Sequence, residues 1–268
     1  MRRVFMIFCL LFYFNNSFGI RPDTNYVAMP KDFGIQTDTK YIKTLDGVQI
    51  ASWFLPSQIK EGNDITIILS FGDAQNMSYW LNMSVGLTNQ GFDVITYDYR
   101  GFGKSESFKI NPKTLYYPEY VMDLKAVIDY SVEIKPNNRI CLMGLSMGSV
   151  ISMLYLNNYG DNNITFYIGE GHIYSPNKVK ENLLKINKEV ILKPDNVDWS
   201  EFYKKLNIPF LLFCANNDIV CDNESKESLL KEIDKIEIKN FEGTHLSGFY
   251  TLNDEYLNDI SSFLLKYK

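Results

Sequence analysis

The feature that most restricts the fold of this chain is the alternation, from Tyr41 onward, of short apolar runs with longer amphipathic stretches. This alternation is typical of an α/β fold built on a mostly parallel sheet. Most of the apolar runs are continuous, as expected for strands covered on both faces. Eight strands are predicted, at Tyr41–Leu45, Val48–Leu55, Ile65–Phe71, Asp93–Tyr97, Arg139–Met143, Ile164–Ile168, Phe210–Cys214 and Ile236–Ile238.

The amphipathic stretches between these strands predict helices that flank the sheet. Several begin near Asp, Asn or Ser, which are residues that cap helix N-termini. The predicted helices are Tyr79–Asn89, Pro118–Val132, Met147–Asn158, Glu224–Ile233 and Asn253–Tyr267. The first two strands are joined by Asp46-Gly47, which is a strong signal for a hairpin.

One segment, residues 174–207, departs from this alternation. It is longer than a simple crossover between strands needs, and it has mixed helical patterning with Pro176 and Pro194. We therefore expect a small lid insertion. The rest of residues 20–268 is expected to form one α/β domain, for which a hydrophobic content of 46% supplies an ample core.

The N-terminus has the composition of a targeting segment. Arg2 and Arg3 precede an apolar run from Val4 to Phe14, and small residues follow at Ser17 and Gly19. This order predicts a signal peptide over residues 1–19, and hence an exported protein, secreted or periplasmic. The apolar run is short for a membrane span, which takes about 20 residues. An uncleaved N-terminal anchor is the alternative.

Charge and cysteine content restrict the partners and the compartment less sharply. The formal net charge is -5, and the basic residues are spread along the chain without forming a stripe, so nucleic acid is not expected as a partner. After the leader three cysteines remain. Cys214 and Cys221 flank Asp218 and could form a disulfide, but spacing alone does not establish that geometry.

A serine lies at a sharp turn between a predicted strand and a predicted helix. The strand Arg139–Met143 runs directly into Gly144-Leu145-Ser146-Met147-Gly148, and the helix follows at once. This G-x-S-x-G pattern, in a strand–turn–helix setting, is typical of the elbow that exposes a nucleophilic serine. The helix N-terminus also favours negative charge that develops beside it. Ser146 is therefore the candidate nucleophile.

A nucleophilic serine needs a base, and the chain has only two histidines. His245 follows the last predicted strand, and His172 follows the strand Ile164–Ile168, so both are expected at the carboxyl edge of the sheet. The chain order Ser, Asp, His favours His245. His172 is expected to be a hydrogen-bonded loop residue.

The acid that orients the histidine is expected just after a strand. Asp218 follows the strand Phe210–Cys214, one strand before His245. Asp222 is the competing candidate, although its position suits a solvated helix N-cap better.

Backbone N–H groups are expected to form an oxyanion hole at the same edge of the sheet. Met147, directly after the serine, supplies one donor, and Asp73, in the turn after the strand Ile65–Phe71, is expected to supply the other. Only the backbone of Asp73 is invoked, because a carboxylate aimed at the oxyanion would oppose catalysis.

Taken together, these stretches resemble the α/β-hydrolase superfamily, in the branch of esterases, monoacylglycerol-lipase-like enzymes and serine aminopeptidase-like members. They occur in the family's order over nearly all of the chain after the leader. The matching stretches are Thr44–Gly47, Phe71–Ala74, Tyr97–Ser105, Gly144–Gly148, Asn217-Asp218 and Gly243–His245. One departure is that Phe71-Gly72-Asp73 stands where the branch usually carries His-Gly-Asn or a similar run.

The resemblance implies an α/β-hydrolase fold and a serine hydrolase that acts through an acyl-enzyme on Ser146. The run Asp98–Ser105 is implied to be a structural turn beside the site. The expected substrates are small-molecule esters or thioesters with an acyl chain of modest to long length, with lipids or membrane-surface esters included, and no cofactor or metal is expected. The alternatives are an amidase or peptidase of the same fold, and a catalytically silent binding protein, for which Asp73 is the only support.

Overall fold

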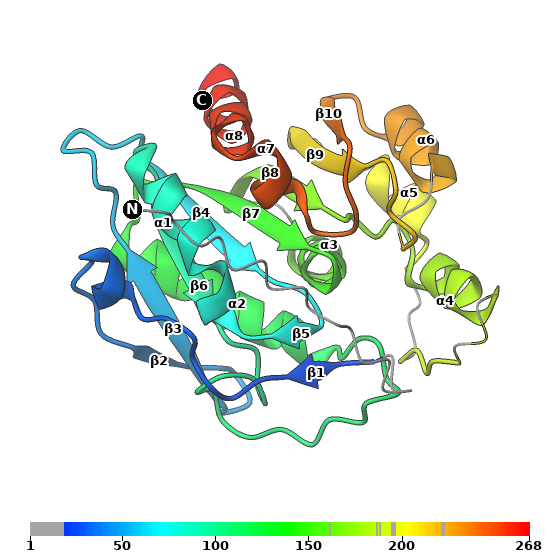
Figure 1. Ribbon diagram of the computed structural model, residues 1–268, viewed down its shortest axis with the longest axis horizontal. Helices are drawn as coiled ribbons and strands as arrows, with labels where there is room; N and C mark the ends of the chain where they lie inside the picture. The colour runs from blue at the N-terminus through cyan, green and yellow to red at the C-terminus, as the bar shows by residue number, and fades with distance from the viewer. Residues whose placement is uncertain (1–18, 161, 186, 188, 194–196, 221–222) are drawn as a thin grey trace, which may run out of the picture.

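The structure is a computed structural model that describes residues 19–268 except 161, 186, 188, 194–196 and 221–222. Within this part of the chain, eight strands form one sheet in the order β10-β9-β8-β7-β4-β6-β3-β2 (Figure 1). The strands are β2 Lys40–Lys43, β3 Gln49–Leu55, β4 Ile65–Ser70, β6 Asp93–Tyr97, β7 Arg139–Leu145, β8 Ile164–Glu170, β9 Phe210–Ala215 and β10 Ile236–Phe241. A separate parallel pair joins β1 (Arg21–Pro22) to β5 (Ala74–Gln75).

Six neighbouring strands run parallel, namely β6, β4, β7, β8, β9 and β10. At one edge of the sheet, β3 pairs antiparallel with both β6 and β2. Every residue of β4 and β6 is buried, as is all of β7 after its first residue. Strands with two covered faces explain the continuous apolar runs of the sequence. The predicted fold class, an α/β fold on a mostly parallel eight-stranded sheet, is confirmed.

Helices cover both faces of the sheet. α2 and α3 pack against each other and contact β4, whereas α1 contacts β3 and β6 and meets α8 near Gly86 and Leu257 (Figure 1). The helices are α1 Leu81–Asn89, α2 Glu119–Ile134, α3 Met147–Tyr159, α4 Pro176–Lys185, α5 Trp199–Tyr203, α6 Asn223–Glu232, α7 Gly248–Leu252 and α8 Asp254–Lys266, with 3-10 turns η1 Pro30–Phe33 and η2 Met77–Trp80. No helix in the described ranges is both long and apolar enough to cross a bilayer.

The strand ends differ from the predicted ones where backbone pairing overrides side-chain pattern. β7 and β8 each continue past the predicted end, because Gly144 pairs with Gly169 and Leu145 with Glu170. Glycine and glutamate are poor strand formers, so the pattern stops two residues early. β2 instead ends at Lys43, because Thr44 turns to accept the N–H of Val48 and to donate to Asp46.

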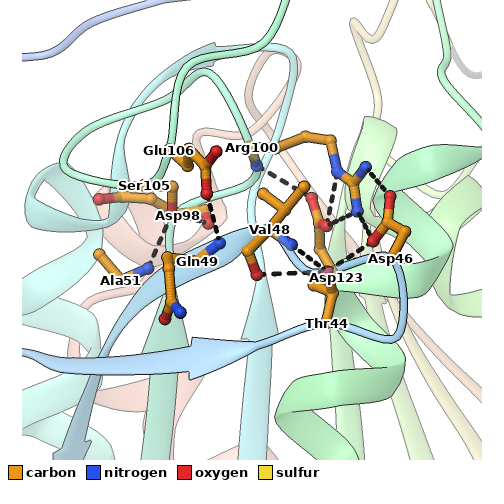
Figure 2. Close-up of polar contacts among 10 residues, drawn as sticks. All are labelled: Thr44, Asp46, Val48, Gln49, Ala51, Asp98, Arg100, Ser105, Glu106 and Asp123. Carbon is orange, nitrogen blue, oxygen red and sulfur yellow. Dashed lines mark hydrogen bonds and ion pairs between the residues drawn. The ribbon is translucent and has the colours of Figure 1, made fainter.

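A charge cluster, in which Arg100 and Asp123 are buried and Asp46 is exposed, ties the first hairpin to the turn after β6 (Figure 2). The guanidinium of Arg100 contacts Asp123 on α2 at 2.7 Å and Asp46 of the hairpin at 2.6 Å. Burial raises the pKa of the Asp123 carboxyl to about 6, and the hydrogen bonds from Arg100 act against this rise. The hydrogen bond from Arg100 lowers the pKa of Asp46 to about 2.

The run Asp98–Ser105 forms a structural turn, as the resemblance implies. The Asp98 carboxylate accepts hydrogen bonds from the backbone of Met77 and Lys104, at 2.8 and 3.0 Å. Ser105 donates to the Asp98 carbonyl and accepts from Ala51 on β3 (Figure 2). These contacts lock the turn after β6 to the hairpin and to the loop after β4.

The segment 174–207 contains α4 and α5 and lies between β8 and β9 (Figure 1). Val179 on α4 and Trp199 and Tyr203 on α5 are buried. Asp198 caps α5 by accepting the N–H of Glu201. The mixed helical patterning thus corresponds to two short helices, while the role of this segment as a lid stays a prediction.

Candidate active site

Ser146 lies at the sharp junction of β7 and α3. Its backbone adopts φ 50° and ψ -115°, a conformation that L-residues rarely hold and that clusters at functional sites. A Cβ at position 148 would lie 1.9 Å from the carbonyl oxygen of Ser70, and one at position 144 would lie 2.7 Å from the Cα of Ser149. Glycine is therefore the residue that fits on both sides of the serine.

Asp218 and His245 reach the same edge of the sheet from the neighbouring strands β9 and β10. Ala215 and Phe241 are paired at the ends of these two parallel strands. The loops beyond them are tied together, because Asn216 donates to the Phe241 carbonyl at 2.9 Å and Asn217 to the Gly243 carbonyl at 3.1 Å. The fold thereby fixes the acid loop against the histidine loop.

The three side chains form one hydrogen-bonded chain. His245 Nε2 lies 2.8 Å from Ser146 Oγ, and His245 Nδ1 lies 2.8 Å from Asp218 Oδ2. Since a carboxylate only accepts hydrogen bonds, Nδ1 carries the proton and Nε2 is left to accept the serine proton. Ser146 makes no capping bond to α3, so its hydroxyl is available to the histidine.

Burial differs along this chain of side chains. The side chain of Asp218 is 4% exposed, that of His245 is 23% exposed, and Ser146 as a residue is 8% exposed. Asp218 also accepts the N–H of Val220 at 2.8 Å, which fixes the carboxylate. A buried, fixed acid beside a partly exposed histidine suits proton transfer to a substrate that enters from solvent.

The turn after β4 lies against the serine. A Cβ at position 72 would lie 3.7 Å from the Cβ of Ser146, so the backbone of Gly72 packs beside the serine. Met147 is the first residue of α3, and the N–H at that position has no acceptor within the helix. The turn that contains Asp73 and the start of α3 at Met147 thus both lie next to Ser146, while the role of their N–H groups as an oxyanion hole stays a prediction.

An N-terminal segment, residues 20–27, holds this turn in place. Arg21 donates to the Asp73 carbonyl at 2.7 Å, and the Asn76 side chain donates to the carbonyls of Asp23 and Asn25. The side chain of Ile20 is buried. This pairing could not be predicted, because a strand of two residues has no periodicity.

A cavity of about 300 Å³ opens beside Ser146 and His245. Most of its wall is apolar and comes from the strand ends and from α4. Its lining residues are Asp73, Leu115, Tyr116, Ser146, Met147, Ile173, Val179, Asn182, Leu183, Ile219, Val220 and His245. Its size lies at the lower end of the range for small-molecule sites.

His172 is not brought to the serine. It is buried, with Nδ1 2.8 Å from the Tyr167 hydroxyl and Nε2 3.0 Å from the Tyr203 hydroxyl. Burial lowers the pKa of His172 to about 3. Both ring nitrogens are occupied by phenols, so His172 joins β8 to α5 as a neutral side chain.

Glu170, at the end of β8, contributes to the site and was not predicted to do so. Its carboxylate accepts the N–H of Gly248 at 2.6 Å and the hydroxyl of Tyr256 at 2.8 Å, and its carbonyl accepts the N–H of Ser146 at 3.0 Å. Burial raises the pKa of the Glu170 carboxyl. The sequence signal that could have indicated this role is an acidic residue just after the predicted strand Ile164–Ile168. Glu170 fixes both the serine turn and the segment after His245.

Three predicted features lie outside the described residues: the leader up to residue 18, the competing acid Asp222, and Cys221 of the candidate disulfide. Among the residues that are described, no group of three or more His, Cys, Asp or Glu side chains is placed to hold a metal ion.

Comparison with known sequences gives matches over the middle of the chain. Residues 64–186 match the family Hydrolase_4, described as serine aminopeptidase, S33. The chain is 31% identical over 105 residues to the uncharacterized protein YfhR of Escherichia coli (strain K12). This match covers 38% of this chain and 36% of that protein. It is 33% identical over 96 residues to a probable lysophospholipase L2 of Haemophilus influenzae, covering 35% and 30%. The chain thus spans about a third of these relatives' lengths.

Comparison with solved structures extends over the whole fold. The esterase Pf2001 of Pyrococcus furiosus superposes with a TM-score of 0.76 at 17% identity, covering 93% of this chain and 97% of that one. An esterase of Exiguobacterium antarcticum superposes with a TM-score of 0.63 at 18% identity, covering 86% and 99%. At these identities the similarity establishes the α/β-hydrolase fold.

Proposed function

We propose that this chain is a serine hydrolase of the α/β-hydrolase superfamily that cleaves carboxylic esters or thioesters. The observation that carries the proposal is the hydrogen-bonded chain from Ser146 Oγ through His245 to Asp218, with 2.8 Å at each step. A serine, a histidine and a carboxylate in this order are the parts of a nucleophilic acyl-transfer site.

The geometry assigns a role to each side chain. His245 Nε2 takes the proton of Ser146 as Oγ attacks the substrate carbonyl, and Asp218 holds the imidazole in the required tautomer and stabilises it once protonated. The N–H groups of Met147 and Asp73 donate to the oxyanion of the tetrahedral intermediate. His245 then gives its proton to the departing alcohol or thiol, which leaves the acyl group on Ser146. Water, activated by the same histidine, releases the acid.

The apolar cavity favours esters with a hydrocarbon acyl chain. Leu115, Ile173, Val179 and Leu183 supply most of its wall near α4. The volume, about 300 Å³, accommodates a short or medium chain. Monoacyl lipids are included in the proposal, since one relative is named a probable lysophospholipase. The proposal includes substrates outside the cytoplasm, because a basic and then apolar N-terminal run is typical of exported proteins.

The test is hydrolysis of p-nitrophenyl esters from acetate to decanoate, with the matching p-nitroanilides run in parallel. We expect ester turnover by the wild type and a loss of about 10⁴-fold or more in Ser146→Ala, as in triad deletions. Turnover of anilides in preference to esters would replace the esterase proposal by an amidase. A folded wild type that cleaves neither series would contradict hydrolase activity.

A further inference from the structure

An acidic side chain stands in the wall of the otherwise apolar cavity beside Ser146. Asp73 is the only Asp or Glu among the described residues that line it, and neither Lys nor Arg lines it within the same part of the chain. The other lining residues with an ionisable group are Tyr116, a phenol, and His245, which is already bonded to Ser146 and Asp218. Any charge-specific contact that this cavity makes with a substrate therefore involves Asp73.

Among the described residues, no other residue donates a hydrogen bond to the Asp73 carboxylate or forms an ion pair with it. Arg21 is exposed on β1, and it bonds the Asp73 carbonyl through its backbone N–H and forms no ion pair with the carboxylate. Burial raises the pKa of the Asp73 carboxyl, and the charges of Arg21 and His245 act in the opposite direction. A carboxylate in this setting gains from a cation that enters the cavity.

The position of Asp73 makes this charge matter for the chemistry. Its N–H is the proposed oxyanion donor, so the same residue brings a negative charge beside the negative charge that forms in the reaction. A substrate cation next to the carboxylate would neutralise this charge, which favours the transition state of a cationic ester over that of a neutral one.

We infer that this site takes esters that carry an ammonium group near the scissile carbonyl, and that Asp73 is the residue that selects them. This inference rests on the proposed serine-hydrolase function. The proposed ligand is an ester that carries a cation within a few bonds of the ester group. Either the alcohol or the acyl part can supply that cation.

The test uses isosteric ester pairs that differ only in charge. Butyrylcholine is compared with 3,3-dimethylbutyl butyrate for the alcohol side. The p-nitrophenyl esters of 4-(trimethylammonio)butyrate and 5,5-dimethylhexanoate are compared for the acyl side. For at least one pair we expect wild-type kcat/KM to favour the cationic ester by about tenfold or more, as for a partly desolvated charge contact.

Asp73→Asn keeps the backbone donor and the side-chain size while removing the charge. We expect it to reduce the cationic preference to about onefold to threefold and to raise kcat/KM on the neutral esters. Asp38→Asn, an exposed carboxylate away from the cavity, is the matched control for net charge and should keep the wild-type ratio. Circular dichroism and melting temperature verify folding of both variants.

The outcomes separate this inference from the function beneath it. Wild type that cleaves the esters with no cationic preference in either pair, or a preference that survives in Asp73→Asn, would overturn the role of Asp73 and leave the hydrolase proposal standing. A folded wild type that cleaves none of the four esters would overturn both.

Discussion

Replacing His172 by alanine separates a structural histidine from the proposed catalytic one. His172 bonds two tyrosines that are fully buried, Tyr167 and Tyr203. Alanine removes the hydrogen bonds between the imidazole and both phenols, and each buried polar group that loses its bond costs about 1–3 kcal/mol. We expect the free energy of unfolding to fall by about 3 kcal/mol, which lowers the melting temperature by roughly 6–12 °C in a domain of this size.

The activity of the folded His172→Ala protein should change little. The imidazole does not touch Ser146, so kcat/KM on an activated ester at 20 °C should stay within about tenfold of wild type. His245→Ala should behave in the opposite way, with a loss of about 10⁴-fold in rate and a nearly unchanged melting temperature. Denaturant titration and ester kinetics on the same samples measure both quantities. A collapse of activity in His172→Ala, with His245→Ala near wild type, would refute this assignment.

The same histidine gives the fold a pH dependence with a defined sign. Its pKa is about 3 when folded and near 6.5 when unfolded, so the unfolded chain binds the extra proton between these values. Stability from His172 is therefore complete above about pH 6.5 and is lost as the pH falls toward 3, by up to about 1.4 kcal/mol per pH unit. His172→Gln, which cannot titrate, should flatten the curve in this range. An identical slope in wild type and His172→Gln would contradict a neutral buried His172.

The remaining predictions concern the acid, the buried glutamate and the N-terminus. Asp218→Asn should reduce kcat by about 10³–10⁴-fold, because the imidazole takes the wrong tautomer. Asp222→Asn should change kcat by less than about tenfold. The reverse order of the two effects would show that Asp222 is the acid. Glu170→Ala should lower the melting temperature and kcat together, because it leaves two buried donors unpaired, whereas Glu170→Gln should retain most of both; equal damage in the two would show that the charge itself is needed. Mass spectrometry of exported protein should find an N-terminus near Ile20, and an intact Met1 on membrane-bound material would favour an anchor.

The fold could be predicted because its signals are local. Most strands of the parallel sheet are continuous apolar runs, and the elbow around Ser146 needs a set spacing of glycines between a strand and a helix. The order of Ser146, Asp218 and His245 along the chain was enough to single them out, and the structure brings these three side chains together.

What could not be predicted depends on contacts between distant segments. The pairing of β1 with β5 spans about fifty residues and involves two residues on each side, so the sequence carries no pattern for it. Glu170 lies 78 residues from its partner Gly248. The phenols around His172 come from β8 and α5, which are separate in the sequence. Chain order was therefore the only sequence signal that His172 is a structural residue and not the catalytic base.

The most direct test of the central claim is to label the protein with a fluorophosphonate and map the adduct by mass spectrometry. Such a reagent phosphonylates a serine that a neighbouring histidine activates. We expect one adduct, on the peptide that contains Ser146, with labelling lost in Ser146→Ala and strongly slowed in His245→Ala. A folded wild type that does not react, or an adduct on another serine that persists in Ser146→Ala, would contradict it.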